Sequence, residues 1–175
     1  MNLSDKSLIA LVLFNNDHRA YEKIVLKYQS DVRGLFIKLT NGNKALADDL
    51  AQDTFIRAYK YLKTFKATAA FSTWLYRISY NVFIDHTKSL KKTDDIAGYD
   101  FISDDNEDVG SEIDMQNAIK VLNENEKVAI LLHYDKGYSH NEIANIMAIP
   151  LGTVKTNILR AKEKLKKYYK YEQTR

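Results

Sequence analysis

Polar and basic side chains between Thr153 and Lys164 have the composition of a surface that reads DNA. Val154, Ile158 and Ala161 recur at helical spacing and predict a helix whose apolar stripe faces a core. Four side chains are expected to face away from that stripe: Lys155, Thr156, Asn157 and Arg160. Arg and Lys favour guanine acceptors in the major groove, and Asn can pair both ways with adenine. Lysines further along the helix, Lys164 among them, suit phosphate contacts, which add affinity without sequence preference.

The residues before this helix predict the other half of a helix-turn-helix. Ser139-His140-Asn141-Glu142 has the form of a capping box, in which serine oxygen and glutamate carboxylate each satisfy a free backbone N–H. A tight turn at Ile149-Pro150-Leu151-Gly152 then joins a short helix to a longer one from Thr153 to about Tyr169. A helix, a short turn and a helix with an exposed basic face form the helix-turn-helix pattern. Taken alone, the basic residues also fit a solvated amphipathic helix with a lysine-rich outer face.

The rest of the chain supplies further helices that position these residues. In the N-terminal half, apolar residues three or four positions apart predict helices over about 4–14, 17–39, 46–62 and 71–89. A turn at 40–43 and a loop at 63–70 separate the later ones. Two more helices, over about 112–122 and 123–135, precede the helix-turn-helix. The sequence therefore predicts an all-α fold.

Charge is distributed unevenly along the 175 residues, although the formal net charge is only +3. Between Thr93 and Asp114 lie nine acidic residues and no Lys or Arg, whereas residues 155–175 hold eight bases and two acids. The acidic stretch has no helical period and cannot bury enough apolar surface to offset the entropy of ordering it. We therefore predict a flexible acidic linker at 93–111, between small helical domains at 1–92 and 112–175.

What the sequence lacks excludes several classes of function. There is no Cys, and the four His have no metal-ligand spacing, so no metal site is expected. No Gly-rich phosphate loop, serine-nucleophile motif or paired carboxylates occur, so we expect neither an enzyme nor a cofactor. The longest apolar run, Leu8 to Phe14, is far shorter than the roughly 20 residues of a membrane span. Without a signal-peptide pattern, a soluble, cytoplasmic protein with no membrane insertion is expected.

The residues of the helix-turn-helix resemble a known family. Tyr138 to Ala144, Ile149 to Thr156 and Arg160 to Lys162 closely resemble the domain of extracytoplasmic-function (ECF) sigma factors that reads the promoter minus-35 element. In that family the recognition helix begins at the Gly-Thr-Val stretch. The resemblance implies minus-35 contacts by Ser139, Thr153, Lys155, Thr156, Asn157, Arg160 and Lys164. Asn157 stands where arginine is frequent, so no particular minus-35 sequence is transferred.

The segment from Asp48 to Tyr59 resembles the part of these sigma factors that docks on the coiled coil of the polymerase largest subunit. Its acids and Gln52 share one exposed face, and Phe55 is placed for core or interface. The resemblance implies core polymerase contacts by Asp48, Asp49, Gln52, Asp53 and Phe55. Taken alone, the same pattern fits an ordinary solvated acidic helix.

Phe71 to Ile78 and the residues after it resemble the segment that recognises and opens the minus-10 element. Opening requires groups that hold bases outside the stack, and aromatic faces do so at roughly 1–3 kcal/mol per base. In this family a preceding loop, here residues 65–70, pockets a flipped base. The implied minus-10 residues are Lys66, Ala67, Thr68, Trp74, Tyr76, Arg77, Asn81, Lys88 and Lys91. Tyr76, Arg77 and Asn81 are expected off the apolar stripe, whereas Trp74 fits both packing and DNA contact.

The resemblance spans about residues 17–167 and implies a bacterial transcription initiation factor. Its implied partners are promoter DNA, core RNA polymerase (through the largest-subunit coiled coil and the flap) and an anti-sigma factor. The acidic linker either mimics nucleic acid along the polymerase channel or keeps the segment soluble and extended. Two other functions stay open: a dimeric repressor or activator that binds duplex DNA without polymerase, and a helical adaptor whose basic helix meets an acidic protein. An apparent affinity that falls steeply as the salt concentration rises, but does not depend on DNA sequence, would favour the adaptor.

Overall fold

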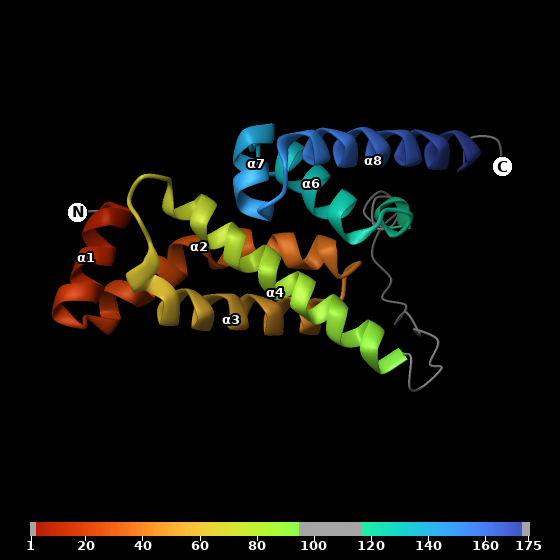
Figure 1. Cartoon of the computed structure of the whole chain (residues 1–175). Coiled ribbons are helices and arrows are strands. Elements are labelled where there is room, and N and C mark those ends of the chain that lie inside the picture. Colours follow the sequence, from red (N-terminus) through yellow and green to blue (C-terminus); the bar gives the residue numbers. More distant parts are fainter. Residues whose placement is uncertain (1–2, 95–116, 173–175) are drawn as a thin grey trace.

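The computed structural model describes residues 3–94 and 117–172, and every regular element within them is a helix (Figure 1). The N-terminal part contains α1 (Asp5–Asn15), α2 (His18–Leu39), α3 (Lys44–Tyr61), the 3₁₀ helix η1 (Leu62–Thr64) and α4 (Phe71–Asp94). In the C-terminal part, residues 117–120 are helical and are followed by α6 (Glu124–Tyr134), α7 (His140–Met147) and α8 (Leu151–Glu172). The all-α expectation is confirmed.

Local caps set the helix ends close to where the sequence predicts them. Ser4 accepts a hydrogen bond from the Ser7 N–H at the start of α1, and Asn16 ends that helix with a left-handed φ of 52°. Asp17 then caps α2 by accepting from two backbone N–H groups. Gly137 has a φ of 73°, a left-handed conformation that glycine adopts at little energetic cost because it has no Cβ. Because these caps end one helix and start the next at defined residues, consecutive helices can reverse direction and pack on one another.

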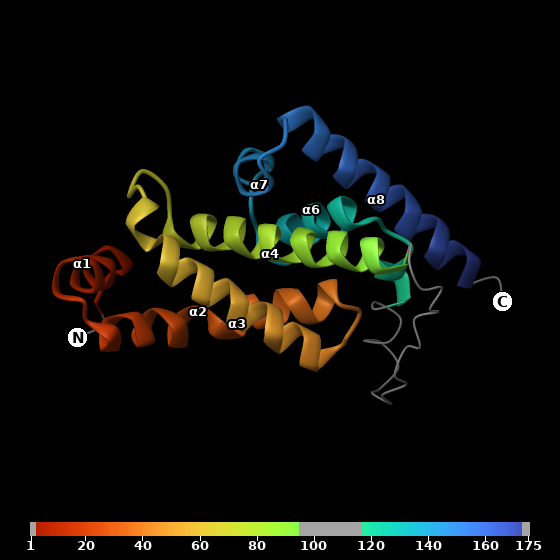
Figure 2. The ribbon, with the colours of Figure 1, turned by 60° about the horizontal axis from the view of Figure 1, so that its bottom comes forward.

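Helices α2, α3 and α4 pack together, with α1 against α2. Figure 2 shows α2 and α3 crossing one another below α4 in the view. Their inward faces bury large apolar side chains completely, among them Ile24, Phe36 and Leu75. Each such side chain stabilises the fold by roughly 1.5–3 kcal/mol. The buried hydroxyls of Thr54 and Ser79 donate to backbone carbonyls one turn earlier, so neither is left unsatisfied.

In the C-terminal part α8 packs on α6 and α7. The capping box is present: Ser139 accepts from the Glu142 N–H, and the Glu142 carboxylate accepts from the Ser139 N–H. Helix α8 begins two residues earlier than expected, because the Pro150 carbonyl already accepts hydrogen bonds from the N–H groups of Thr153 and Val154. Helix α4 likewise extends five residues beyond its predicted end at 89.

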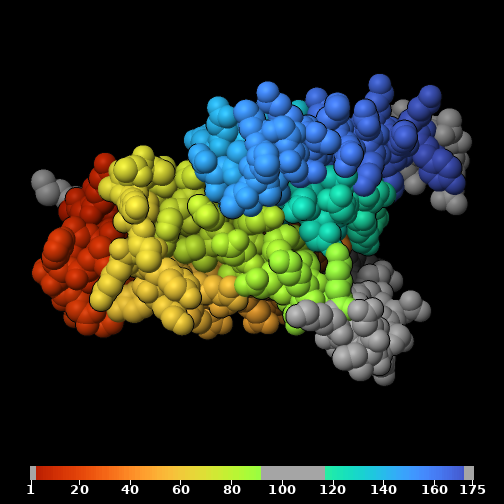
Figure 3. Space-filling model, viewed as in Figure 1, coloured from red at the N-terminus to blue at the C-terminus, as the bar shows by residue number. Residues whose placement is uncertain are grey.

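The two parts pack on one another rather than standing apart. Helix α7 lies against α4 and α6 lies against α2, and Figure 3 shows the C-terminal residues seated on the green surface of α4. Buried apolar side chains from both parts form one continuous cluster. Of the predicted linker 93–111, only 93 and 94 are described, as the last residues of α4, and the remainder lies outside the described residues.

Candidate nucleic-acid interface

The outer face of α8 presents a row of polar and basic side chains. Thr153, Lys155, Thr156 and Arg160 are all exposed. The Thr156 hydroxyl donates to the Gly152 carbonyl at 2.9 Å, which fixes its orientation on the first turn of the helix. Ser139 is also exposed, although its hydroxyl is engaged in the capping box. The structure therefore brings most of the predicted minus-35 residues to accessible positions.

Asn157 does not lie on that face, and its predicted orientation is wrong. It is 8% exposed and shares the inward face of α8 with Val154, Ile158 and Ala161. The reason is the helical period, because position 157 is three residues after Val154 and four before Ala161. Its side-chain nitrogen is buried without a hydrogen-bond partner among the described residues. Asn157 therefore faces the core of the helix-turn-helix rather than a base.

Lys164 is not available as a free phosphate ligand either. Its Nζ lies 2.7 Å from Oε2 of Glu126, whose side chain is only 2% exposed. The same carboxylate oxygen accepts the Asn123 N–H and so completes the capping box of α6. The positive charge of Lys164 is thus paired inside the C-terminal part, while Lys162, Lys166 and Lys167 are exposed.

The loop before α4 and the first turns of α4 enclose a cavity of about 470 Å³. Its walls include Lys66 and Thr68 from the loop and Trp74 and Arg77 from α4. Trp74 packs against the rings of Phe65 and Phe71, with centroids 5.6 and 5.5 Å away, and it also lines the cavity. Four further predicted minus-10 residues, Ala67, Asn81, Lys88 and Lys91, are exposed.

Tyr76 departs from its expected place off the apolar stripe, since it is 5% exposed. Its ring meets that of Tyr138 edge-on, with centroids 5.5 Å apart, and burial raises the pKa of its hydroxyl. The periodicity of α4 cannot reveal this contact because the covering residue comes from the turn before α7. Sequence reasoning also missed Asn145 of α7, which completes the wall of the cavity beside α4. No local signal marks either residue as an interface residue.

A second, mainly apolar hollow of about 550 Å³ lies between α2 and α3. It is lined by three of the predicted polymerase-contact residues, Asp48, Gln52 and Phe55, together with Ile56 and Tyr59. Asp49 is exposed nearby, and Asp53 pairs with Arg57 at 3.0 Å. We call this hollow the α2–α3 groove.

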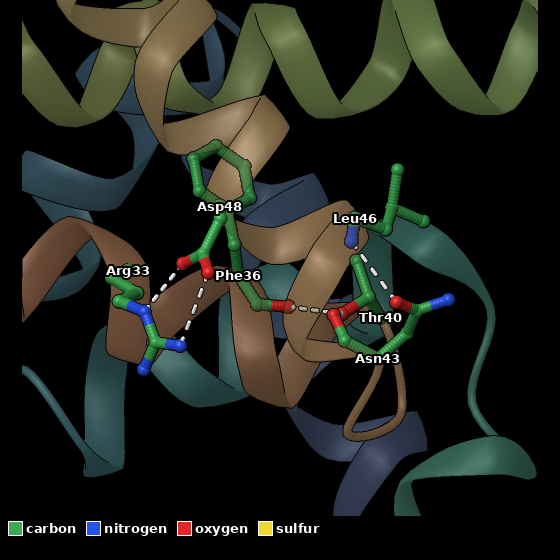
Figure 4. A network of polar contacts seen from close by, with 6 residues as sticks. All are labelled: Arg33, Phe36, Thr40, Asn43, Leu46 and Asp48. Atoms are coloured by element: carbon green, nitrogen blue, oxygen red, sulfur yellow. Dashed lines mark hydrogen bonds and ion pairs between the residues drawn. The ribbon is translucent and has the colours of Figure 1, made fainter.

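Arg33 sets the position of Asp48 at one end of this groove (Figure 4). Its guanidinium donates to both carboxylate oxygens, with N–O distances of 2.5 and 3.3 Å. This hydrogen bonding holds the pKa of Asp48 below its usual value. In the same view Asn43 accepts from the Leu46 N–H and so starts the helix that carries Asp48.

Two negative findings concern only residues 3–94 and 117–172. No group of three or more His, Cys, Asp or Glu side chains there is arranged to hold a metal ion. No helix there is long and apolar enough to cross a membrane.

Comparison with known proteins identifies the two parts. Residues 24–93 match the family described as Sigma-70 region 2, and residues 113–165 match Sigma-70, region 4. The chain is 33% identical to RNA polymerase sigma-H factor of Pseudomonas aeruginosa, over 93% of this chain and 92% of that protein. It is 36% identical to ECF RNA polymerase sigma factor SigW of Bacillus subtilis, over 86% and 89% of the two chains.

Among solved structures, the fold is similar to that of the sigma factor RpoE from Bartonella quintana, determined in complex with the anti-sigma factor NepR. The TM-score is 0.75 at 23% identity, covering 86% of this chain and 96% of that one. The chain described here belongs to the sigma-70 family as an extracytoplasmic-function sigma factor, a non-enzymatic transcription initiation factor that directs RNA polymerase to promoters.

Proposed function

We propose that the outer face of α8 reads the minus-35 element in the major groove. Thr153, Lys155, Thr156 and Arg160 contact base edges, and Ser139, the exposed N-cap of α7, adds a further contact. The exposed lysines further along α8 bind the phosphate backbone. The observation that supports this proposal is the exposure of this face while α8 is packed on α6 and α7.

The cavity between loop 65–70 and α4 takes a flipped minus-10 base in this proposal. Trp74 offers an aromatic face, Arg77 a cation and Lys66 a second cation at the rim. Base–aromatic stacking contributes roughly 1–3 kcal/mol per base, which offsets part of the cost of separating the strands. Asn81, Lys88 and Lys91 follow on exposed positions of α4 and extend the path for the backbone. In this proposal the energy for strand opening comes from these binding contacts alone.

The α2–α3 groove docks on the coiled coil of the polymerase largest subunit. Its apolar walls suit a helical partner, and the acids Asp48, Asp49 and Asp53 lie on α3 along the same surface. A second apolar groove, between α6 and α8 and lined by Ile130, Tyr134 and Leu165, fits the flap. The division into a polymerase and minus-10 domain (1–92), a linker (93–111) and a minus-35 domain (112–175) belongs to the same proposal.

We also propose that an anti-sigma factor controls this chain and that the chain acts in the cytoplasm. The similarity to a sigma factor solved with an anti-sigma factor supports the first point, because the matched folds extend over most of both chains. An inhibitor that covers either groove would prevent docking on polymerase.

Run-off transcription with purified core polymerase and a library of promoter fragments tests the function. Specific start sites that appear only with this chain are expected. Arg160→Ala should weaken promoters according to their minus-35 sequence, and Arg77→Ala according to their minus-10 sequence. Arg19→Ala, at an exposed position on α2 outside the proposed sites, is the matched control. Core polymerase that is neither bound nor redirected would overturn the proposal.

A further inference from the structure

Leu159 is a large apolar side chain on the outer face of α8, where the residues proposed to read bases are polar or charged. It is 57% exposed, although the preceding residue, Ile158, is buried. Residues three and four positions apart are neighbours on a helix surface, so Leu159 adjoins both Lys155 and Thr156. Arg160 follows it directly. An apolar side chain is therefore set among the residues that we propose to contact base edges.

The packing of the folded chain does not account for Leu159. The core cluster of the described residues includes Val154, Ile158 and Ala161 from α8 but not Leu159. The apolar groove between α6 and α8 likewise includes Leu165 but not Leu159. A single exposed leucine is ordinary on a protein surface, so exposure alone assigns it no role. Its position among base-reading residues is what distinguishes it.

The charges around Leu159 favour DNA over an apolar protein surface as its partner. Lys155, Arg160 and Lys162 are exposed on the same two turns of α8. These cations attract phosphates, whereas an apolar partner would have to remove them from water without pairing them. In the major groove the one methyl group that base edges present is the C5 methyl of thymine. Leucine has no hydrogen-bond donor or acceptor, so this methyl group is the feature of a base edge that it can recognise.

We propose that Leu159 selects thymine in the minus-35 element by packing against its C5 methyl group. The inference rests on the proposed function of α8. Cytosine at the same place presents an amino donor, which the leucine would separate from water without offering an acceptor. Uracil keeps the hydrogen-bonding groups of thymine and lacks only the methyl group. Leu159 therefore discriminates against cytosine through an unsatisfied donor and against uracil through the loss of one apolar contact.

Replacement of thymine by deoxyuridine, one position at a time, tests the contact because it removes only the methyl group. The starting point is a promoter on which core polymerase with this chain gives specific start sites. Each thymine in either strand of its minus-35 element is replaced, and binding of the polymerase complex is measured by competition. At one position the replacement should weaken binding about fourfold, the change expected when one buried methyl group is lost. Leu159→Ala should bind the thymine promoter more weakly and should lose this difference at that position.

Leu26→Ala is the matched control. Leu26 is 60% exposed, close to the value for Leu159, but it lies on α2. The control should therefore keep the full effect of the deoxyuridine replacement. Urea denaturation of Leu159→Ala should match that of the unmodified chain, since the residue lies outside the core cluster. A loss of binding by Leu159→Ala is then a loss of contact and not of folding.

A failure of the proposed function would give a different result. In that case no base change in the minus-35 element would alter binding, either by the unmodified chain or by Arg160→Ala, and both proposals would fall together. If Arg160→Ala changes the minus-35 preference but no methyl effect depends on Leu159, only the role of Leu159 is overturned. A minus-35 element without any A·T pair also overturns it. So does a Leu159→Ala variant that weakens all promoters equally, which would assign Leu159 to a protein contact.

Discussion

Lys164 and Glu126 form an ion pair in which one partner is exposed to solvent and the other is almost fully buried. The Glu126 carboxylate also accepts the Asn123 N–H, so the pair joins the start of α6 to the second half of α8. A buried carboxylate is costly unless it is paired and hydrogen-bonded. The lysine that resembles a DNA ligand in the sequence is therefore part of what holds α8 on α6.

Lys164→Met is expected to lower the free energy of unfolding by about 2 kcal/mol. Removing one partner of a buried pair costs roughly 3–5 kcal/mol, and the partial exposure of Lys164 reduces that figure. Lys166→Met, at an exposed position on the same helix, is the control and should change stability little. Adding Glu126→Gln to Lys164→Met removes the unpaired charge and should recover most of the loss. Urea denaturation measures all three, and equal effects of Lys164→Met and Lys166→Met would contradict the assignment.

The helix ends that carry a cap were predictable from the sequence because their causes are local, whereas the end of α4 and the start of α8 differ from the prediction by five and two residues. Ser139 and Glu142 are three residues apart, and Gly137 is the residue that tolerates the left-handed conformation next to them. The family was predictable for the same reason, since its motifs are short and contiguous. These features depend on neighbours within a single helical turn.

Three site residues were placed wrongly from the sequence. Two of them contact residues that lie elsewhere in the chain, and for the third the residue type was given more weight than the helical position. Tyr76 is covered by Tyr138, and Lys164 is paired with Glu126, and neither partner lies on the same helix. Asn157 is different, since positions 154, 157, 158 and 161 lie on one helical face, so its inward position follows from the helical period itself. The type of a side chain suggested DNA contact in all three cases, whereas its place in the fold decides what it can reach.

Asn157→Leu is expected to raise the free energy of unfolding by about 1–3 kcal/mol. The buried side-chain nitrogen of Asn157 has no partner among the described residues, and a buried, unsatisfied polar group costs about that much. Leu has the same branched arrangement of side-chain heavy atoms, although its two methyl groups are bulkier than the amide, so the neighbouring side chains must adjust slightly. Thermal unfolding should show the gain, and promoter preference in run-off transcription should stay the same. A changed minus-35 preference would mean that Asn157 reaches DNA.

Ile56→Glu is expected to weaken binding to core polymerase roughly tenfold without unfolding the chain. Ile56 is 59% exposed and lines the α2–α3 groove, where a charge would remain desolvated against an apolar partner. Leu26→Glu is a close control, because Leu26 is 60% exposed on α2 but does not line that groove. Titration of a labelled chain with core polymerase gives the two affinities. Equal affinities would place the polymerase contact elsewhere on the chain.

Ser139→Ala is expected to destabilise the helix-turn-helix in a way that depends on pH. Hydrogen bonds from the Ser139 side chain and backbone lower the pKa of Glu142 below its ordinary value of 4.5. A carboxyl group with a lowered pKa contributes stability above its ordinary pKa and loses it as the pH falls through the lowered one. The substitution should therefore cost about 1 kcal/mol at neutral pH and clearly less in acid.

Ser4→Ala is the matched control, because Ser4 caps α1 through the Ser7 N–H without a carboxylate partner in the cap. The cost of Ser4→Ala should be similar near pH 7 and in acid, since no carboxylate takes part in that cap and a serine does not change protonation. Thermal unfolding at both pH values, each variant against the unmodified chain, cancels the effect of acid on the rest of the protein. A cost of Ser139→Ala that stays constant from neutral pH to acid would show that Glu142 contributes nothing through its charge, and that the serine oxygen alone caps α7.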